Sequence, residues 1–279
     1  MKSPDQVFIL EYFDRQLDEF SVFLKRIPGV YKMKDIHQIR VRIKRLKAIF
    51  RLLEFIHPVE FRAKDRFRLF KPVFKNAGLI RESQINLSLL ANYSGTDKLY
   101  KSYSKYVANL RSEWNANLDS AVSAFNHNHL IQIKEEVHKY FSKSTETELV
   151  GLLTDFIYAE CERIKDMIDE SGRIEYAHEG RIILKNIKPV LALLWPRVDS
   201  IFNETHYKSL NTSEKLIGNW HDRVVLLDSL TRFYRGRDQN KKKISEEYNS
   251  LKKRIQKYEK DAMEEIHRSL EETLLLLKA

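Results

Sequence analysis

Cationic side chains at helical spacing are the residues of this sequence best suited to bind a ligand. Within residues 35–51, a histidine and four cations recur every three or four positions: His37, Arg40, Lys44, Lys47 and Arg51. At about 100° per residue, these side chains fall within about 80° of one another around a helix. Like charges at this spacing repel one another, and no acidic residue lies between them in the sequence. This set, the first cationic stripe, therefore predicts an anionic ligand.

The opposite side of the same segment is suited to a hydrophobic core. Its apolar residues recur with the helical period: Ile39, Ile43, Leu46, Ile49, Phe50 and Leu53. Arg42 and Arg45 fall away from the stripe. One such segment alone is also what an ordinary amphipathic helix with a basic outer side would show, so a single stripe leaves that alternative open.

A second segment repeats the spacing, and this repetition favours a functional role. Residues at the same relative positions form the second cationic stripe: His178, Arg181, Lys185 and Lys188. Its apolar side is built from Ile183, Leu184, Ile187, Val190, Leu191 and Leu194. The position that corresponds to Arg51 is Ala192, and the acidic residues Glu175 and Glu179 lie nearby. We therefore expect the first stripe to bind an anion more strongly than the second.

Catalytic signatures are weak in comparison. His221 and Asp222 are adjacent, and metal-dependent phosphohydrolases use such His-Asp pairs. A metal site, however, needs three or four ligands with suitable spacing. Five further histidines do not supply them, because they are scattered: His127, His129, His138, His206 and His267. The sequence also lacks a glycine-rich phosphate loop and a Gly-x-Ser-x-Gly elbow. We therefore expect no catalytic residues, no metal and no cofactor, and we expect His221 and Asp222 to form a turn or interhelix hydrogen bond.

The positive charge of the chain is concentrated in one segment. The 279 residues contain 49 Lys and Arg and 39 Asp and Glu, a net charge of +10. Residues 34–81 hold 14 basic and 4 acidic side chains, so this segment alone carries the net +10 and the rest of the chain sums to zero. Such concentration indicates an anionic partner.

Cysteine content and hydrophobicity indicate the cellular compartment. Cys161 is the single cysteine, so no intrachain disulfide can form, and we expect it to be a small buried residue in a reducing environment. The apolar run near the N-terminus is too short for a signal peptide, and no stretch approaches the ~20 apolar residues of a membrane span. We therefore expect a cytoplasmic protein without a membrane partner.

The elements that must position the stripes are helices. Only 8 Gly and 6 Pro interrupt the chain, and no alternating strand pattern occurs. The periodicity predicts an all-α fold. The first helix is expected over about 4–26 and the second from an N-cap at Asp35 to Pro58. The helical pattern then resumes and continues through residue 76, and further helices are expected over about 80–92, 97–126 and 240–278. Gln38, three residues after Asp35, has the spacing of a capping box.

The order of features indicates an internal duplication. His37 and His178 lie 141 residues apart, Gly78 and Gly218 lie 140 apart, and the turn residue Gly95 lies 141 from Gly236. A constant offset predicts two similar antiparallel helical bundles, an N-terminal one over residues 1–143 and a C-terminal one over residues 144–279.

Four motifs in this order resemble those of the CHAD family, the conserved histidine α-helical domain. The first is His37-x2-Arg40-Val41-x2-Lys44-Arg45-Leu46-Lys47-x3-Arg51, and the second-half histidine stripe matches it. The segment Lys71-x3-Lys75-x-Ala77-Gly78-x2-Arg81-Glu82 resembles the family's Leu-Gly-x2-Arg-Asp element. The segment Leu216-Ile217-Gly218-x2-His221-Asp222 resembles its Leu-Gly-x2-His-Asp element. The resemblance spans essentially the whole chain.

The resemblance implies two helical bundles related by a pseudo-twofold, with a basic cavity or groove between or along them. It also implies non-catalytic binding of inorganic polyphosphate, including at polyphosphate granules. Carried over by position, the expected contacts are His37, Arg40, Lys44, Lys47, Arg51, Lys71, Lys75, Arg81, His178, Arg181, Lys185 and Lys188. The chain departs from the pattern where Glu82 replaces Asp and where Asn211 corresponds to Lys71.

Other functions remain open at this point. Nucleic-acid or general polyanion binding would fit the charge, although the first stripe has no interleaved aromatic residues on which bases could stack, so a nucleic-acid partner is not expected. A polyphosphate-processing enzyme would need an acidic or metal site that the sequence does not supply. A purely structural helical scaffold would explain the duplication but not the concentration of charge.

Overall fold

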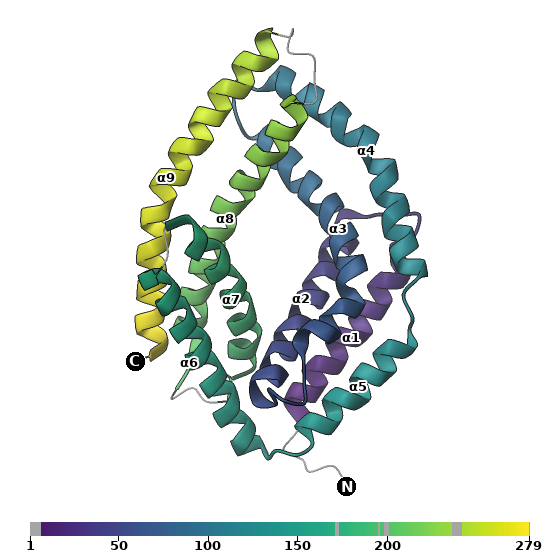
Figure 1. Cartoon of the computed structure of the whole chain (residues 1–279), viewed down its shortest axis with the longest axis vertical. Coiled ribbons are helices and arrows are strands. Elements are labelled where there is room, and N and C mark those ends of the chain that lie inside the picture. The colour runs from purple at the N-terminus through teal and green to yellow at the C-terminus, as the bar shows by residue number, and fades with distance from the viewer. Residues whose placement is uncertain (1–6, 171–172, 195, 198–200, 236–241, 279) are drawn as a thin grey trace.

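The computed structural model describes residues 7–170, 173–194, 196–197, 201–235 and 242–278, and these residues form helices without any strand (Figure 1). The helices are α1 (Val7–Arg26), α2 (Met33–Ile56), α3 (Ala63–Ala91), α4 (Asp97–Ser123), α5 (Asn128–Phe141), α6 (Glu146–Glu170), α7 (Arg173–Leu194), α8 (Glu204–Arg235) and α9 (Lys242–Lys278). The predicted all-α fold is confirmed.

The start of α2 differs from the prediction. The helix begins at Met33, after an extended Lys32, so Asp35 lies in its first turn and is not the N-cap. Positive φ angles at Gly29 and Tyr31 turn the chain sharply after α1, and this turn lets the helix restart earlier than expected. An acidic residue in the first turn still interacts favourably with the helix dipole.

Residues 63–91 form one helix, whereas the sequence predicted a break near residue 76. Pro72 lies inside α3, where it removes one backbone donor but does not end the helix. Burial of Phe70, Val73, Ala77 and Ile80 along one side holds the helix together across this position. Tertiary packing thus overrides the local preference of proline and of Gly78.

Both stripe-bearing helices bury the apolar sides that the periodicity predicted. Every residue assigned to the core side of α2 and of α7 is buried. Cys161 is also buried, on α6, and burial raises the pKa of its thiol to about 12. The core of the protein is therefore largely fixed by helical periodicity, and the polar sides of α2 and α7 are left for other contacts.

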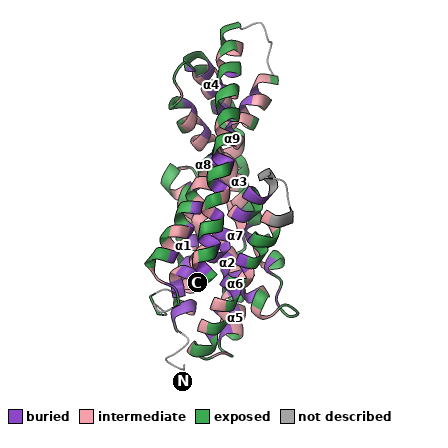
Figure 2. Cartoon of the chain, turned by 90° about the vertical axis from the view of Figure 1, so that its left-hand side faces the viewer, coloured by how far each residue is buried: buried purple, intermediate pink, exposed green. Residues whose placement is uncertain are grey.

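The two halves of the chain meet in two places. At one, α2 lies beside α7; at the other, the far ends of α3 and α4 meet those of α8 and α9 (Figure 1). In the side view, the molecule is broad around α2 and α7 and narrow at the far end, and exposed residues cover the outer sides of the helices (Figure 2). The narrow end has its own apolar cluster, with Leu90 and Tyr103 from one half and Leu230 and Phe233 from the other.

The predicted boundary at residue 143 falls in the connection between α5 and α6. The larger apolar cluster, however, contains residues from both sides of that boundary. The division into two domains over 1–143 and 144–279 therefore stays a prediction, as does the pseudo-twofold. Gly236, one of the positions that suggested the duplication, lies outside the described residues. No helix within the described ranges is long and apolar enough to cross a membrane.

Candidate functional site

The two cationic stripes come together where α2 packs beside α7. The electrostatic coupling shows how close they lie: Lys44 of α2 and Arg181 of α7 both lower the pKa of Lys185. Each helix turns its apolar side to the core, and the polar sides meet across the contact between the halves. The site is thus built from segments about 140 residues apart in the chain.

A first cavity of about 450 Å³ opens beside this contact. It is lined by residues of α2, α3, α7 and α8. Its basic lining residues are His37, Arg40, Lys44, Lys75, Arg81, Arg181 and His221. Two carboxylates, Glu82 and Asp222, also line it. Positive groups outnumber the carboxylates, so the cavity favours an anion.

A second cavity of about 460 Å³ adjoins the first and shares His37, Val41 and Lys44 with it. It lies among α1, α2, α7 and α8. The remaining lining residues are Tyr12, Arg15, Arg45, Lys185, Lys188, Pro189, Ala192, Leu193, Tyr207 and Glu214. The shared residues make Lys44 the link between the two cavities.

Arg40 is held in a fixed position at the first cavity. Its Nη1 donates a hydrogen bond to the carbonyl oxygen of Phe74 at 2.6 Å, and its guanidinium lies 4.2 Å from the centroid of the Phe74 ring. A Cβ atom on Gly78 would come within 2.7 Å of that Nη1, so glycine leaves room for the guanidinium. Burial lowers the pKa of Arg40 to about 10, so the group stays charged at neutral pH.

Lys44 and Lys185 are partly buried cations that Glu214 and Asp222 attract only from beyond ion-pair distance. Neither ammonium group has an ion pair or hydrogen bond to any of the described residues. Burial, followed by repulsion from Arg40 and Arg181, lowers the pKa of Lys44 to about 8. Burial, followed by repulsion from Lys44 and Arg181, lowers the pKa of Lys185 to about 7. A bound anion would favour the charged form of both amines.

Arg181 and His221 form the second-half wall of the first cavity. The Arg181 guanidinium lies 3.9 Å from an Asp222 carboxylate oxygen, and its buried Nε has no hydrogen-bond partner within the described parts of the chain. Burial, followed by repulsion from Arg181 and His178, lowers the pKa of His221 to about 4, so this imidazole is neutral near pH 7. A neutral imidazole can still donate one hydrogen bond.

The two stripe histidines occupy different positions. Burial, with Arg81 and Lys44 as further causes, lowers the pKa of His37, which lines both cavities. His178 is exposed, outside the lining of both, with its ring centroid 5.2 Å from that of His221. His37 is therefore placed to contact a ligand directly, and His178 lies at the edge of the site.

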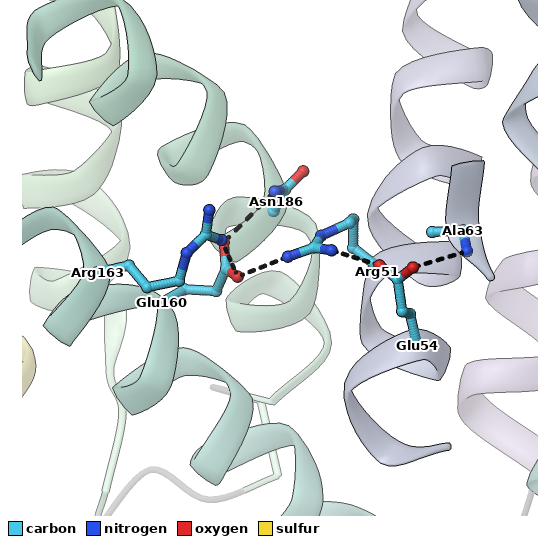
Figure 3. Close-up of polar contacts among 6 residues, drawn as sticks. All are labelled: Arg51, Glu54, Ala63, Glu160, Arg163 and Asn186. Carbon is cyan, nitrogen blue, oxygen red and sulfur yellow. Dashed lines mark hydrogen bonds and ion pairs between the residues drawn. The ribbon is translucent and has the colours of Figure 1, made fainter. Parts of the chain in front are cut away.

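Arg51 lies at a contact between the halves and lines neither cavity. Its guanidinium pairs with Glu54 of α2 and lies 3.5 Å from the carboxylate of Glu160 on α6 (Figure 3). Glu160 also accepts hydrogen bonds from Arg163 at 2.6 Å and Asn186 at 3.4 Å. This arrangement connects α2 to α6, and the charge of Arg51 is satisfied within the protein.

The other residues expected to contact the ligand differ in whether they line a cavity and whether their charge is already paired. Lys75 is exposed at the first cavity, whereas Lys71 is exposed on α3 outside the lining of both cavities. Lys47 is also outside both linings, with its Nζ 5.1 Å from the centroid of the Phe67 ring. Lys188 lines the second cavity, but its Nζ contacts Glu214 at 2.6 Å and Asn211 at 2.7 Å.

The structure adds site residues that the sequence analysis did not select. His221 and Asp222 lie inside α8, so the turn predicted for them is wrong, and no hydrogen bond joins either side chain to another described helix. His221 occupies the place in its motif that Arg81 occupies in the first half, so the motif could have identified it. Arg45 was placed off the stripe, and its Nη1 donates to Gln16 at 3.2 Å, yet it lines the second cavity. Tyr12 and Tyr207 carry no sequence signal, because only the packing of α1 and α8 brings them to the site.

The acidic side chains described near the cavities lie beside cations and are not grouped as metal ligands. Within the part of the chain that the structure describes, no group of three or more His, Cys, Asp or Glu side chains is placed to hold a metal ion. The acidic residues at the cavities lie near cations: Asp222 near Arg181, Glu214 near Lys188 and Glu82 near Arg232. Their arrangement suits the orientation of basic side chains.

Comparison with known proteins identifies the fold. No family model and no curated protein matches the sequence. Among solved structures, the crystal structure of the CHAD domain from the plant Ricinus communis is similar, with a TM-score of 0.72 and 14% sequence identity. The match covers 97% of this chain and 92% of that chain. This protein therefore has a CHAD-like, all-α fold.

Proposed function

We propose that this chain binds inorganic polyphosphate, without catalysing its turnover, through the cations gathered where α2 meets α7. The observation that carries the proposal is the pair of unpartnered, partly buried amines of Lys44 and Lys185, which face each other from the two halves. Desolvated like charges are costly unless a ligand neutralises them. A polyanion would supply the missing charge to both.

The chemistry of polyphosphate fits this arrangement. It is a chain of phosphates with about one charge each, without bases, sugars or apolar surface, so its recognition depends on charge-assisted hydrogen bonds and on the release of counterions. Arg40, Arg81 and Arg181 offer planar donor groups around the first cavity, and Lys44 continues the path toward Lys185. In cells, this binding would place the protein at polyphosphate, including polyphosphate granules.

A binding role fits the acidic residues better than a catalytic one. Hydrolysis of a phosphoanhydride needs a metal or a general base beside an attacking water. The carboxylate of Glu214 contacts the ammonium of Lys188, and that of Asp222 lies near the guanidinium of Arg181. These carboxylates are suited to position cations, as the proposal requires.

Titration of long-chain polyphosphate tests the proposal. We compare the wild type with Lys44→Met/Lys185→Met at two salt concentrations, with single-stranded RNA as competitor. The matched control is Lys253→Met/Lys257→Met, which removes the same charge from exposed positions of α9. We expect the cavity variant to lose at least tenfold in affinity, about 1.4 kcal/mol, and to show a weaker salt dependence, whereas the control stays within about twofold.

Three results would contradict the proposal. Equal losses in the two variants would mean that only net charge matters. Equal competition by RNA would make the protein a general polyanion binder. Release of orthophosphate from polyphosphate in the presence of Mg²⁺, lost in the Lys44→Met/Lys185→Met variant, would make it an enzyme.

A further inference from the structure

The second cavity has a wall that a chain of phosphates would not use. None of the described residues that line the first cavity is Phe, Tyr or Trp. The first cavity has four apolar lining residues, Val41, Leu79, Ile85 and Val225, whereas the second has six apolar or aromatic ones, two of them tyrosines: Tyr12, Val41, Pro189, Ala192, Leu193 and Tyr207. Polyphosphate has no apolar surface to place against them. The cavity therefore suits a ligand that carries both an anionic and an apolar part.

The two tyrosines belong to different halves of the chain. Tyr12 lies on α1 and Tyr207 near the start of α8, and both are partly buried and pack against the larger apolar cluster. The guanidinium of Arg15 lies 5.6 Å from the centroid of the Tyr12 ring. Burial raises the pKa of Tyr12 against the lowering effect of the nearby arginines, Arg45 first, so its phenol stays neutral, and both tyrosines line the same cavity. Aromatic rings at a cavity wall offer a surface on which a flat base can stack.

The polar part of the same cavity has two kinds of group. Five Lys or Arg side chains line it, Arg15, Lys44, Arg45, Lys185 and Lys188, and among the described residues only Lys188 has an ion-pair partner. One carboxylate, Glu214, is held there by Lys188. Cations bind phosphate oxygens, and a fixed carboxylate accepts hydrogen bonds from sugar hydroxyls.

We propose that the second cavity binds a nucleoside di- or triphosphate, with its phosphates at Lys44 and Lys185 and its base against the wall that contains Tyr12 and Tyr207. Its volume of about 460 Å³ lies within the ~300–1,000 Å³ of small-molecule sites. This site goes beyond the proposed function. Because Lys44 lines both cavities, a nucleotide and polyphosphate would compete there.

The test compares ligands that differ by one part of the nucleotide. ADP, pyrophosphate and adenosine are titrated calorimetrically into the full chain at about 150 mM salt, where distant charges are screened. Pyrophosphate keeps the phosphates without the nucleoside, and adenosine keeps the nucleoside without the phosphates. We expect ADP to bind at least tenfold more tightly than either one. Equal affinities for ADP and pyrophosphate would overturn the proposal, even if polyphosphate binds as proposed above.

A variant pair locates the nucleoside. Tyr12→Leu/Tyr207→Leu keeps apolar volume but removes both rings, and we expect it to weaken ADP at least fivefold while pyrophosphate changes by less than twofold. The matched control is Tyr93→Leu/Tyr100→Leu, two partly buried tyrosines at the narrow end, which should leave both ligands unchanged. Thermal unfolding checks that each variant folds. An equal loss for ADP and pyrophosphate in the Tyr12/Tyr207 variant would contradict a base at this wall.

Discussion

At the scale of single residues, the site consists of cations whose partial burial and mutual repulsion reduce the free energy of unfolding. Arg181 lies close enough to lower the pKa values of Arg40, Lys44 and Lys185. A ligand is a more effective partner for such groups than solvent, because partial burial has already removed much of their hydration. Two predictions follow from individual side chains.

The first concerns the amine of Lys185, whose pKa is about 7 in the free protein. A bound anion favours the charged form, so binding raises this pKa and takes up a proton. Affinity for polyphosphate is therefore highest below pH 7 and falls as the pH rises through 7 and 8, where Lys44 also loses its proton. The decline is limited to about tenfold per pH unit for each amine.

Titrations from pH 6 to pH 9 measure this decline. Lys185→Arg, which keeps its charge over that range, should flatten it near pH 7. A wild-type affinity that stays constant between pH 6 and pH 9 would show that neither lysine meets the ligand. His37 has a lowered pKa and is not expected to produce the decline.

The second concerns Gly78, which leaves room for the Arg40 guanidinium. In Gly78→Ala, the new methyl group meets Nη1 of Arg40 at 2.7 Å, and the flexible end of that side chain must move away from the Phe74 carbonyl oxygen. We expect polyphosphate affinity to fall about fivefold, about 1 kcal/mol. The free energy of unfolding should change by less than this, because the helix preference of alanine over glycine, about 1 kcal/mol, offsets the steric cost of the methyl group.

Gly151→Ala in α6 is the matched control, since no atom lies within 4 Å of its added Cβ. It should gain stability and keep its affinity. Unchanged affinity in Gly78→Ala would show that the position of Arg40 is unimportant for binding. The comparison uses polyphosphate titration and thermal unfolding of both variants.

At the scale of helices, α2 has two different roles along its length. Its first half presents His37, Arg40 and Lys44 to the cavities, and its end is fixed to α6 through Arg51 and Glu160. The Glu160 carboxylate is nearly buried and contacts Arg51, Arg163 and Asn186 (Figure 3). Contacts of this type hold α2 in position so that its first half can face α7.

Glu160→Gln tests this anchoring role. The amide cannot neutralise two guanidinium groups, so we expect the free energy of unfolding to fall by about 1–3 kcal/mol, whereas polyphosphate affinity should not fall. Glu162→Gln is the control, because Glu162 forms an exposed pair with Lys278 and such pairs contribute about 0–1 kcal/mol. Denaturant unfolding measures both variants. A loss of affinity in Glu160→Gln as large as that in Lys44→Met/Lys185→Met would show that the anchor at Glu160 sets the position of the cavity cations and not the stability alone.

At the scale of the whole molecule, the two halves are held at both ends of the region that contains the site. The contact of α2 with α7 forms one end, and the apolar cluster of the narrow end forms the other (Figure 1). Tyr103 adds a polar link there, since its hydroxyl lies 2.7 Å from the hydroxyl of Ser229 in the other half. Two separate contacts restrict the opening of the first cavity more than one contact would.

Leu230→Ala tests the contribution of the narrow end. Leu230 is fully buried in the smaller apolar cluster, so we expect a loss of about 2–5 kcal/mol in stability. Hydrogen exchange should quicken in residues 90–107, 226–235 and 242–255, with little change in α2 and α7. Leu275→Ala, at a position that is 71% exposed, is the control and should change neither property. Uniformly faster exchange across the chain would show that the narrow end is not a separate contact.

The helices, their buried sides and the cationic stripes followed from the sequence, because a period of 3.6 residues is a local property of the chain. That period correctly assigned Ile39, Ile43 and Leu46 to the core and kept Arg42 off the stripe, where it pairs with Glu19. The same local rules misplaced the start of α2 and divided α3 in two, since they do not include the packing that carries a helix through Pro72.

Which cations are available was decided by the tertiary structure alone. Arg51 and Lys44 are equivalent in the sequence pattern, yet Arg51 lies against Glu160, 109 residues away, and Lys44 has no such partner among the described residues. Tyr12 and Tyr207 reach the second cavity only because α1 and α8 pack beside it. Contacts between distant segments depend on how helices pack, and a helical period does not encode that packing.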